Sequence, residues 1–268
     1  MSGFVHSQFS AGRAEKDSFA VKRARFAFSE ADGRFSFKLQ ADAVIEPVLL
    51  DAYLESRLNE SLKIRMGQFK IPMSAEALTP ASKKDLINKY QFIGKMLPSK
   101  CRDSGVTASG EFPGNKISYS AGVFNGNGPN NKADNDDTFL YIARLSAKPT
   151  PSIKAGIGFA GSHEKVKGNS KIETSLLTAA PGFAPYKKRI AQADMEIKRE
   201  RISLKAEYIA GTYKPDDSTI DEVDASGCGI TGSYSVIPKK VTAVIRYEQY
   251  DPDKNVTDKN DVSWTTLG

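Results

Sequence analysis

The stretch SLKIRMGQFKIPMSAEAL, residues 61–78, begins with the alternation of a β-strand and then breaks it. Apolar and basic side chains alternate through its first half. Gly67 then removes a side chain, and Pro72 removes a backbone donor that a sheet would use. A polar stretch of about thirty residues follows as far as Arg102, and connections of that length are uncommon in compact domains. The role of this stretch therefore depends on the architecture around it.

The same alternation repeats along the whole chain. In RFSFKLQAD, residues 34–42, Phe35 and Leu39 alternate with Ser36 and Lys38. A period of two residues puts successive side chains on opposite faces of a strand, so each such segment has one apolar and one polar face. We mark thirteen of these segments, at residues 4–12, 18–30, 33–45, 48–58, 61–70, 103–112, 115–125, 138–147, 152–163, 187–199, 201–212, 225–237 and 239–250.

The lengths of the segments and of their links favour a transmembrane β-barrel. Many segments reach about nine residues, which suits a strand that crosses a bilayer at a tilt. Tight links such as PKK (238–240) alternate with long polar links, as in outer-membrane barrels, which have short turns at one rim and long loops at the other. The long links lie at 71–101, 126–137, 164–186 and 213–224. No linker divides the chain, so we predict an all-β fold with one domain over residues 1–268, a large antiparallel transmembrane β-barrel.

Charged side chains recur on the polar faces of nearly every segment. A soluble β-sandwich or β-solenoid also has polar faces, but charges on so many strands favour a water-filled lumen. Because acids and bases are both numerous, most of them are expected to pair and to hold the wall. The basic residues are Arg23, Arg25, Arg34, Lys38, Arg57, Lys63, Arg65, Lys154, Lys198, Lys205 and Arg246. The acidic residues are Asp42, Asp51, Glu55, Asp194, Glu196, Glu207 and Glu248.

Composition limits the classes of function. The chain has 268 residues, a net charge of +6 and a pI near 9.1, which favour anionic partners. No apolar run is long enough for a transmembrane helix. Two scattered histidines are too few for a zinc site, and no phosphate-binding loop, dinucleotide fingerprint or nucleophile elbow occurs, so we predict no cofactor, no metal and no catalytic residue. Cys101 and Cys228 form either one disulfide or two free thiols.

Nine longer stretches carry a resemblance to a known family. They are SFAVKRARFAF (18–28), LLDAYLE (49–55), LKIRMGQFKIPMSAEAL (62–78), CRDSGV (101–106), SYSAGVFNGNG (118–128), YIARL (141–145), SLKAEYIAG (203–211), IRYEQYDPD (245–253) and the final TTLG. In sequence and order they resemble the phosphate-selective porin O and P family over nearly the whole chain. The resemblance implies an outer-membrane, trimeric barrel of sixteen strands that conducts anions. Counted against that pattern, the chain stops within strand fourteen and is expected to lack about two strands at its C-terminal end.

The resemblance also implies a role for the opening stretch. In porins of this architecture the loop after the fifth strand folds into the lumen and narrows it, and residues 71–101 follow the fifth marked segment. Irregular backbone at membrane depth is tolerated only where it is buried in protein or lines a water-filled cavity. The alternative is an ordinary extracellular loop with solvated lysines. Arg23, Arg25, Arg65 and Arg246 match arginine-bearing strands of the family. The predicted pore-lining and anion-binding residues are Arg23, Arg25, Arg34, Lys38, Lys63, Arg65, Lys83, Lys84, Lys89 and Arg246.

These observations predict a porin of the bacterial outer membrane that lets small anions diffuse, including phosphate or polyphosphate. Its partners would be those anions, outer-membrane lipid and two further copies in a homotrimer, with no nucleic acid. The acids among the inner-face bases favour a weak anion preference over strict phosphate specificity. The first residues, MSGFVHSQFS, show no signal peptide. The alternatives are a soluble β-sheet module that binds sugars or polyanions, and an outer-membrane enzyme, for which no nucleophile and base are evident.

Overall fold

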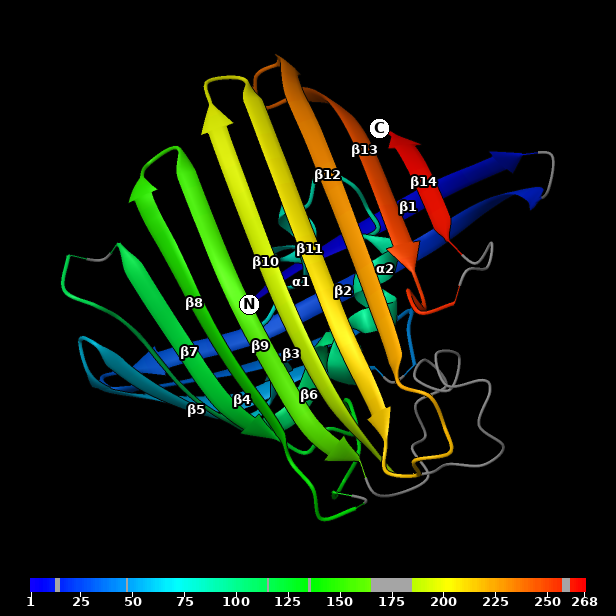
Figure 1. Cartoon of the computed structure of the whole chain (residues 1–268). Coiled ribbons are helices and arrows are strands. Elements are labelled where there is room, and N and C mark those ends of the chain that lie inside the picture. The colour runs from blue at the N-terminus through cyan, green and yellow to red at the C-terminus, as the bar shows by residue number, and fades with distance from the viewer. Residues whose placement is uncertain (13–14, 47, 115, 135, 165–184, 257–260) are drawn as a thin grey trace.

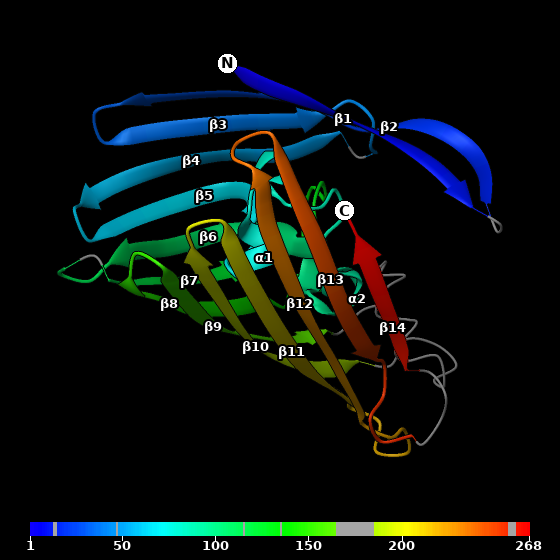
Figure 2. The ribbon, with the colours of Figure 1, turned by 90° about the horizontal axis from the view of Figure 1, so that it is seen from above.

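The structure is a computed structural model that describes residues 1–268 apart from 13–14, 47, 115, 135, 165–184 and 257–260. Its strands form one antiparallel sheet of fourteen, in which each strand pairs with the next along the chain (Figures 1 and 2). The sheet curls strongly, and β1 and β14 are its two edges. The predicted all-β architecture of one large barrel-type sheet is confirmed.

Thirteen of the strands lie on the thirteen marked segments, with ends displaced by a few residues, and β14 lies outside them. The strands are β1 Ser2–Gly12, β2 Glu15–Asp32, β3 Phe35–Asp42, β4 Leu49–Asn59, β5 Leu62–Lys70, β6 Arg102–Glu111, β7 Ile117–Phe124, β8 Leu140–Thr150, β9 Ile153–Glu164, β10 Tyr186–Arg199, β11 Ile202–Pro215, β12 Val223–Ile237, β13 Val241–Asp251 and β14 Val262–Leu267.

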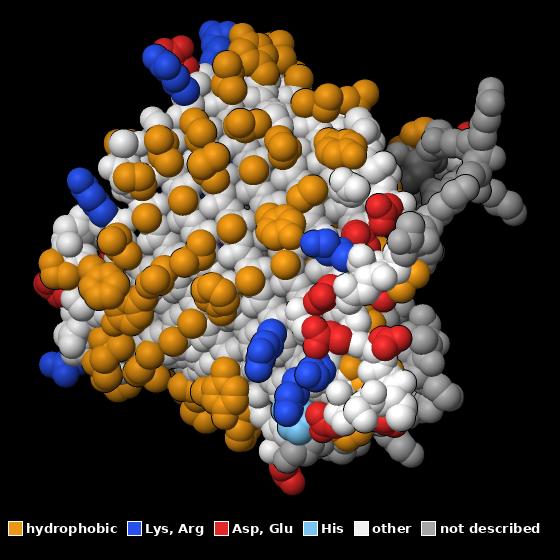
Figure 3. All heavy atoms as spheres, viewed as in Figure 1, with side chains coloured by type: hydrophobic (Ala, Val, Ile, Leu, Met, Phe, Trp, Pro, Cys, Tyr) orange, Lys and Arg blue, Asp and Glu red, His pale blue; other side chains and the backbone are white. Residues whose placement is uncertain are grey.

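Alternation along each strand separates an outer face from an inner face. On β13, Ile245 and Tyr247 are 57% and 48% exposed, whereas Arg246 and Glu248 are 4% and 2% exposed. The outer face of the sheet is largely hydrophobic over the strands that Figure 3 shows. Apolar side chains on an outer face suit a hydrocarbon surrounding. Between the edges β1 and β14, each strand also pairs its backbone with two neighbours, which suits the same surrounding.

Three basic residues depart from simple alternation. The pairing of β1 with β2 passes from Arg23 directly to Val21, so Lys22 is the extra residue of a β-bulge. Arg199 is the last residue of β10, exposed beside the turn to β11. Arg34 was predicted to lie mid-strand, but that placement is wrong, because Arg34 is exposed in the tight turn between β2 and β3. The cause is Gly33, which takes a φ of 56° and bends the chain there.

The two ends of the sheet differ in the length of their links. Short turns join β8 to β9, β10 to β11 and β12 to β13 at the upper end in Figure 1, and long links run at the lower end. Residues 165–184 of the predicted link 164–186 lie outside the described part of the chain. None of the helices in the described residues is long and apolar enough to cross a membrane.

The segment between β5 and β6 folds into the concave side of the sheet, as predicted (Figure 2). We call residues 71–101 the inner loop. It contains α1 (Ala75–Leu78), α2 (Gln91–Met96) and two 3₁₀ turns, Ala81–Lys83 and Pro98–Cys101. Ser74 caps α1 by accepting a hydrogen bond from the backbone N–H of Ala77 at 3.0 Å. The main hydrophobic core lies between this loop and the inner wall, and it includes Met73, Phe92, Ile93, Met96, Ile190, Ile209 and Tyr213.

Candidate functional site

Two glycines on the inner face of β12 receive the aromatic part of the inner loop. A Cβ at Gly227 would stand 2.5 Å from Cβ of Phe92, and a Cβ at Gly229 would stand 2.5 Å from Cε1 of Tyr90. The two rings stack with their centroids 5.2 Å apart. The hydroxyls of Tyr90 and Thr231 share a 2.8 Å hydrogen bond, and burial raises the pKa of Tyr90 to about 12, so its hydroxyl stays protonated. Only glycine allows this close approach of the loop to β12.

Arg246 on β13 fastens the same loop by its charge. Its Nη1 donates to the carbonyl oxygen of Asn88 at 2.8 Å, and its Nη2 lies 3.3 Å from Oε1 of Glu76. The guanidinium also lies over the Tyr90 ring, 4.2 Å from its centroid. The Arg246 and Glu76 side chains are 5% and 8% exposed, so this ion pair is buried. Arg246 was predicted to line the pore, whereas the structure places it between wall and loop.

Two further carboxylates on the wall accept backbone hydrogen bonds from the loop. Glu207 on β11 accepts from the N–H of Glu76 at 3.1 Å, and Glu248 on β13 accepts from the N–H of Gln91 at 2.5 Å. A buried carboxylate that accepts a backbone N–H keeps its charge at lower cost than an unpartnered one. The inner loop is therefore bound to the β11–β13 side of the sheet, and its other side is turned toward β2.

On that other side lies a cavity of about 420 Å³, which we call the basic cavity. Its described lining contains six basic side chains and no Asp or Glu. They come from β2, from the end of β5, from the inner loop and from the start of β6, and they are Arg23, Arg25, Lys70, Lys84, Lys89 and Arg102. Segments far apart in the chain thus combine one sign of charge around one space, which favours an anion.

Three of the six basic side chains of the cavity are paired with carboxylates that lie behind them. The other three have no carboxylate within 4 Å among the described residues, so the cavity keeps a positive excess. The ion pairs are Arg25–Asp42 at 2.7 Å, Arg102–Asp51 at 2.9 Å and Lys84–Glu76 at 2.9 Å.

The three cations without a carboxylate have neutral neighbours. Lys70 donates to the carbonyl oxygens at the end of α1, including that of Ala77 at 2.5 Å. A cation at a helix C-terminus is favourable because the free carbonyl groups carry partial negative charge. Arg23 lies 3.3 Å from Nδ1 of His6, and Nζ of Lys89 lies 3.1 Å from Sγ of Cys101. The contacts of Arg23 and Lys89 leave donors available to an entering anion, whereas all three N–H donors of Lys70 are used by the carbonyl oxygens of the loop.

Lys84 sits at the boundary between loop and cavity. Burial lowers the pKa of Lys84, and the Glu76 carboxylate opposes that shift. Lys89 and Arg246 lower the pKa further through repulsion between like charges. An anion next to Lys84 would favour its charged form, so binding and protonation support each other.

The predicted site residues fall into three groups in the structure. Arg23, Arg25, Lys84 and Lys89 line the basic cavity. Lys38, Lys63 and Arg65 belong to the inner wall at β3 and β5 outside the cavity's lining, with Lys38 2.7 Å from Asp51 and Arg65 2.5 Å from Glu55. The remaining three are Arg34 in a turn, Lys83 exposed on the loop, and Arg246 under the loop.

Sequence reasoning missed two members of the cavity, Lys70 and Arg102. They are the last residue of β5 and the first of β6, and they face each other in the register of that pair. The signal was present, because an inward loop that leaves one strand and returns on its neighbour must bring its two flanking residues together. The buried Arg144 and Lys188 on β8 and β10 were also missed, and they lie 2.7 Å from Asp194 and 3.0 Å from Glu164.

The two cysteines lie apart in the structure. Cys101 and Cys228 are both free, so of the two alternatives the structure has separate thiols. Within the described residues, no group of three or more His, Cys, Asp or Glu side chains could hold a metal ion.

Comparison with known sequences and structures finds one family and several solved relatives. The profile of the family described as "Phosphate-selective porin O and P" matches residues 8–266. A search of curated protein sequences finds no match. Neither result points to a soluble sugar- or polyanion-binding module, the alternative predicted from the sequence.

Among solved structures, an anion-selective porin from Comamonas acidovorans superposes with a TM-score of 0.70 at 12% identity, over 99% of this chain and 81% of that one. In-vitro folded OmpT of Vibrio cholerae, an outer membrane protein in its trimer form, gives a TM-score of 0.64 at 12% identity, over 100% of this chain and 82% of that one. A variant of OmpT that lacks loop L8 gives 0.63 at 12% identity, over 99% and 86%. At such low identity these likenesses show the fold.

Proposed function

The chain belongs to the phosphate-selective porin O and P family, and on that premise we propose that it forms a water-filled channel through which small anions diffuse across the bacterial outer membrane. The family and the fold are those of channels rather than enzymes. The hydrophobic outer face of the sheet supports a place in lipid, and the long links at one end would face the outside.

The basic cavity is the observation that carries this proposal. Six basic side chains surround one space with no acidic side chain among its described lining, and three of them have no carboxylate within 4 Å in the part of the chain that the structure describes. Anion preference in a pore requires such a ring of Arg and Lys. The inner loop is the constriction in this proposal, because it occupies the β11–β13 side and leaves the space beside β2 for the ion path.

Phosphate is one of the anions we propose, with a preference that stays weak. Arg23, Arg25 and Arg102 supply guanidinium groups, whose paired donors match an oxyanion. Two of these three arginines are already held by Asp42 and Asp51, so part of their donor capacity is used. Partial neutralisation also lets an ion leave again, which conduction requires as much as binding does.

A trimer is the assembly we propose. OmpT, which shares the fold, is described in a trimer form, and the Comamonas porin is described as anion-selective. Both properties are those of the relatives. They support the same expectations for this chain, together with its own apolar outer face and basic cavity.

Reconstitution in a planar lipid bilayer tests the proposal. With a gradient of potassium chloride across the bilayer, the reversal potential should have the sign of anion preference. Phosphate added to one side should reduce the chloride current, because both anions would use the basic cavity. A preference for cations, or a chloride current that does not change when phosphate is added, would contradict the proposal.

A further inference from the structure

Basic side chains gather on the outer face at the loop end of β10 and β11. Lys187 and Arg189 on β10 and Lys214 on β11 are exposed, and alternation puts them on the same face as Phe159 and Ala191. In the register of the sheet, Lys187 stands directly opposite Lys214 on one side and His163 on the other. Like charges directly opposite each other destabilise a sheet, so this arrangement needs a compensating group.

The described part of the chain does not supply that group. The Asp216 carboxylate lies 2.7 Å from Nε2 of His163 and is not within 4 Å of Nζ of Lys187 or Lys214. Among the described residues, no Asp or Glu carboxylate lies within 4 Å of the charged nitrogens of Lys187, Arg189, Lys214 or Lys254. Figure 3 shows this end of the face as the place where charged side chains border the hydrophobic area.

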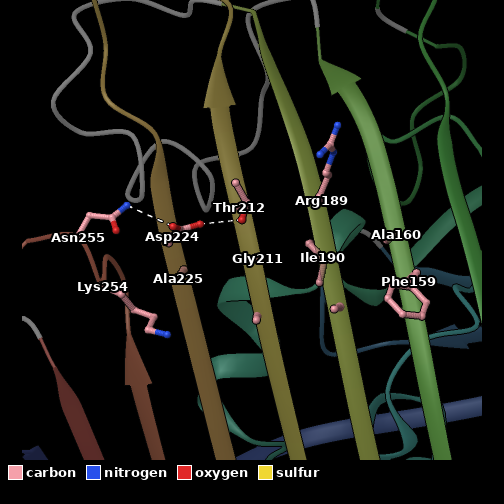
Figure 4. Close-up of a pocket in the computed structure, with 12 residues that line it drawn as sticks. Phe159, Ala160, Arg189, Ile190, Gly211, Thr212, Asp224, Ala225, Lys254 and Asn255 are labelled. Carbon is pink, nitrogen blue, oxygen red and sulfur yellow. Dashed lines mark hydrogen bonds between the residues drawn. The ribbon is translucent and has the colours of Figure 1, made fainter.

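Beside these cations the outer face is hollowed by a cavity of about 750 Å³, drawn in Figure 4. Phe159, Ala191 and Ala210 give it an apolar floor, and Arg189 and Lys254 border it from two sides. Its described lining has one acid, Asp224.

The Asp224 carboxylate of this outer cavity is already engaged. Its Oδ1 accepts from the Thr212 hydroxyl at 2.7 Å, and its Oδ2 accepts from Asn255 Nδ2 at 3.4 Å (Figure 4). The cavity therefore joins apolar surface to basic groups that are still available.

We propose that Lys187, Arg189, Lys214 and Lys254, here named the outer basic patch, bind the phosphate of an anionic membrane lipid whose acyl chains lie over Phe159 and the adjoining apolar face. The inference rests on the membrane placement proposed above. A phosphate at this level would sit at the boundary of the hydrocarbon region, where headgroups lie. Its negative charge would relieve the repulsion between Lys187 and Lys214, and the Arg189 guanidinium can hold two of its oxygens. A free anion would satisfy the charges but would leave the apolar floor uncovered.

Lipid retention on the full chain tests the inference. The protein is purified in a neutral detergent, incubated with phosphatidylglycerol, and examined by native mass spectrometry for bound lipid. The Lys187→Ala/Arg189→Ala/Lys214→Ala variant should bind the lipid at least about tenfold more weakly, since each basic residue near a membrane surface contributes to attraction of anionic lipid. The control, Lys116→Ala/Lys148→Ala/Lys240→Ala, removes three exposed cations at the short-turn end and should bind like the wild type.

A folding control and two further binding measurements accompany the comparison of the variants. Migration on a gel before and after boiling establishes that each variant is folded. Equal lipid binding by the two triple variants would overturn the inference. So would equal retention of zwitterionic phosphatidylcholine by the wild type, or displacement of the lipid by equimolar inorganic phosphate, which would indicate a site for a free anion. Channel currents from the same samples separate the proposed lipid site from the proposed anion channel. Lipid retention without any current would contradict the channel function and leave the lipid site standing.

Discussion

At the scale of single residues, the glycines of β12 decide where the inner loop can lie. Replacing Gly229 with Ala puts a Cβ 2.5 Å from the Tyr90 ring, so the ring and the loop must move. Overpacking of this kind costs about 1–3 kcal/mol. We expect Gly229→Ala to lower the free energy of unfolding by that amount in urea titrations in lipid vesicles, and to change the single-channel conductance.

Gly232 on the same strand is the matched control. A Cβ there would meet only Ile245 Cγ2 at 3.6 Å, an ordinary contact. Gly232→Ala should leave the conductance unchanged and should not lower the free energy of unfolding. The added methyl group meets no close neighbour, and alanine reduces the conformational entropy of the unfolded chain relative to glycine. If the two substitutions behave alike, the loop is not held by the fit at β12.

Arg246 offers a second test at this scale. Arg246→Met keeps the length of the side chain but removes the buried partner of Glu76. Breaking a buried pair from one side costs about 3–5 kcal/mol, and Lys84 remains near Glu76, so we expect a loss near the lower end. Lys154→Met, which breaks an exposed pair with Glu196, should cost less than about 1 kcal/mol. Equal losses in urea titrations would mean that Arg246 does not anchor the loop.

Sequence patterns at the residue scale found the basic character of the site but not its full membership. Arg23 and Arg25 could be placed because alternation assigns each to the inner face. Lys70 and Arg102 could not, because alternation loses its meaning where a strand ends. Arg246 shares the inner face with the pore-lining residues, yet only the tertiary contact with Glu76 and Asn88 shows that the loop covers it.

At the scale of elements, the two faces of each strand have different solvents. Leu39 on β3 is 46% exposed on the outer face, whereas Gln40 is the next residue, on the inner face. Leu39→Arg should lower the free energy of unfolding in vesicles by about 2–4 kcal/mol, because the charge would enter hydrocarbon. Gln40→Arg, at the same depth, should be mild because it enters water beside Asp51. Equal losses would contradict the assignment of faces.

Elements were easier to predict than residues, for a physical reason. A strand repeats its signal every second residue, so thirteen strands could be marked from alternation alone. β14 has only six residues, VSWTTL, too few for the pattern to stand out. In the inner loop, α1 and α2 are so short that the wall must stabilise them.

At the scale of the whole molecule, the position of the inner loop determines where ions can pass. Its aromatic and acidic contacts bind it to β11–β13, so the open space lies between the loop and β2. Protein surrounds this space and lowers the effective dielectric constant, so a unit charge a few ångströms from an ion contributes more than the ~1 kcal/mol it has in bulk water. Anion preference should therefore depend on the basic cavity and not on the net charge of the chain.

The basic cavity should set the preference of the channel for anions, and charge removal at matched positions checks this. Reversal potentials in a salt gradient are compared for two double variants that lose the same charge. Arg23→Gln/Lys89→Gln removes two cavity cations that have no carboxylate partner among the described residues. Arg34→Gln/Lys240→Gln removes two exposed cations in turns at the far end, where salt screens charges beyond about 8–10 Å. We expect the first double variant to move the reversal potential toward zero and the second to leave it unchanged. Equal shifts in both, or no shift in the first, would contradict it.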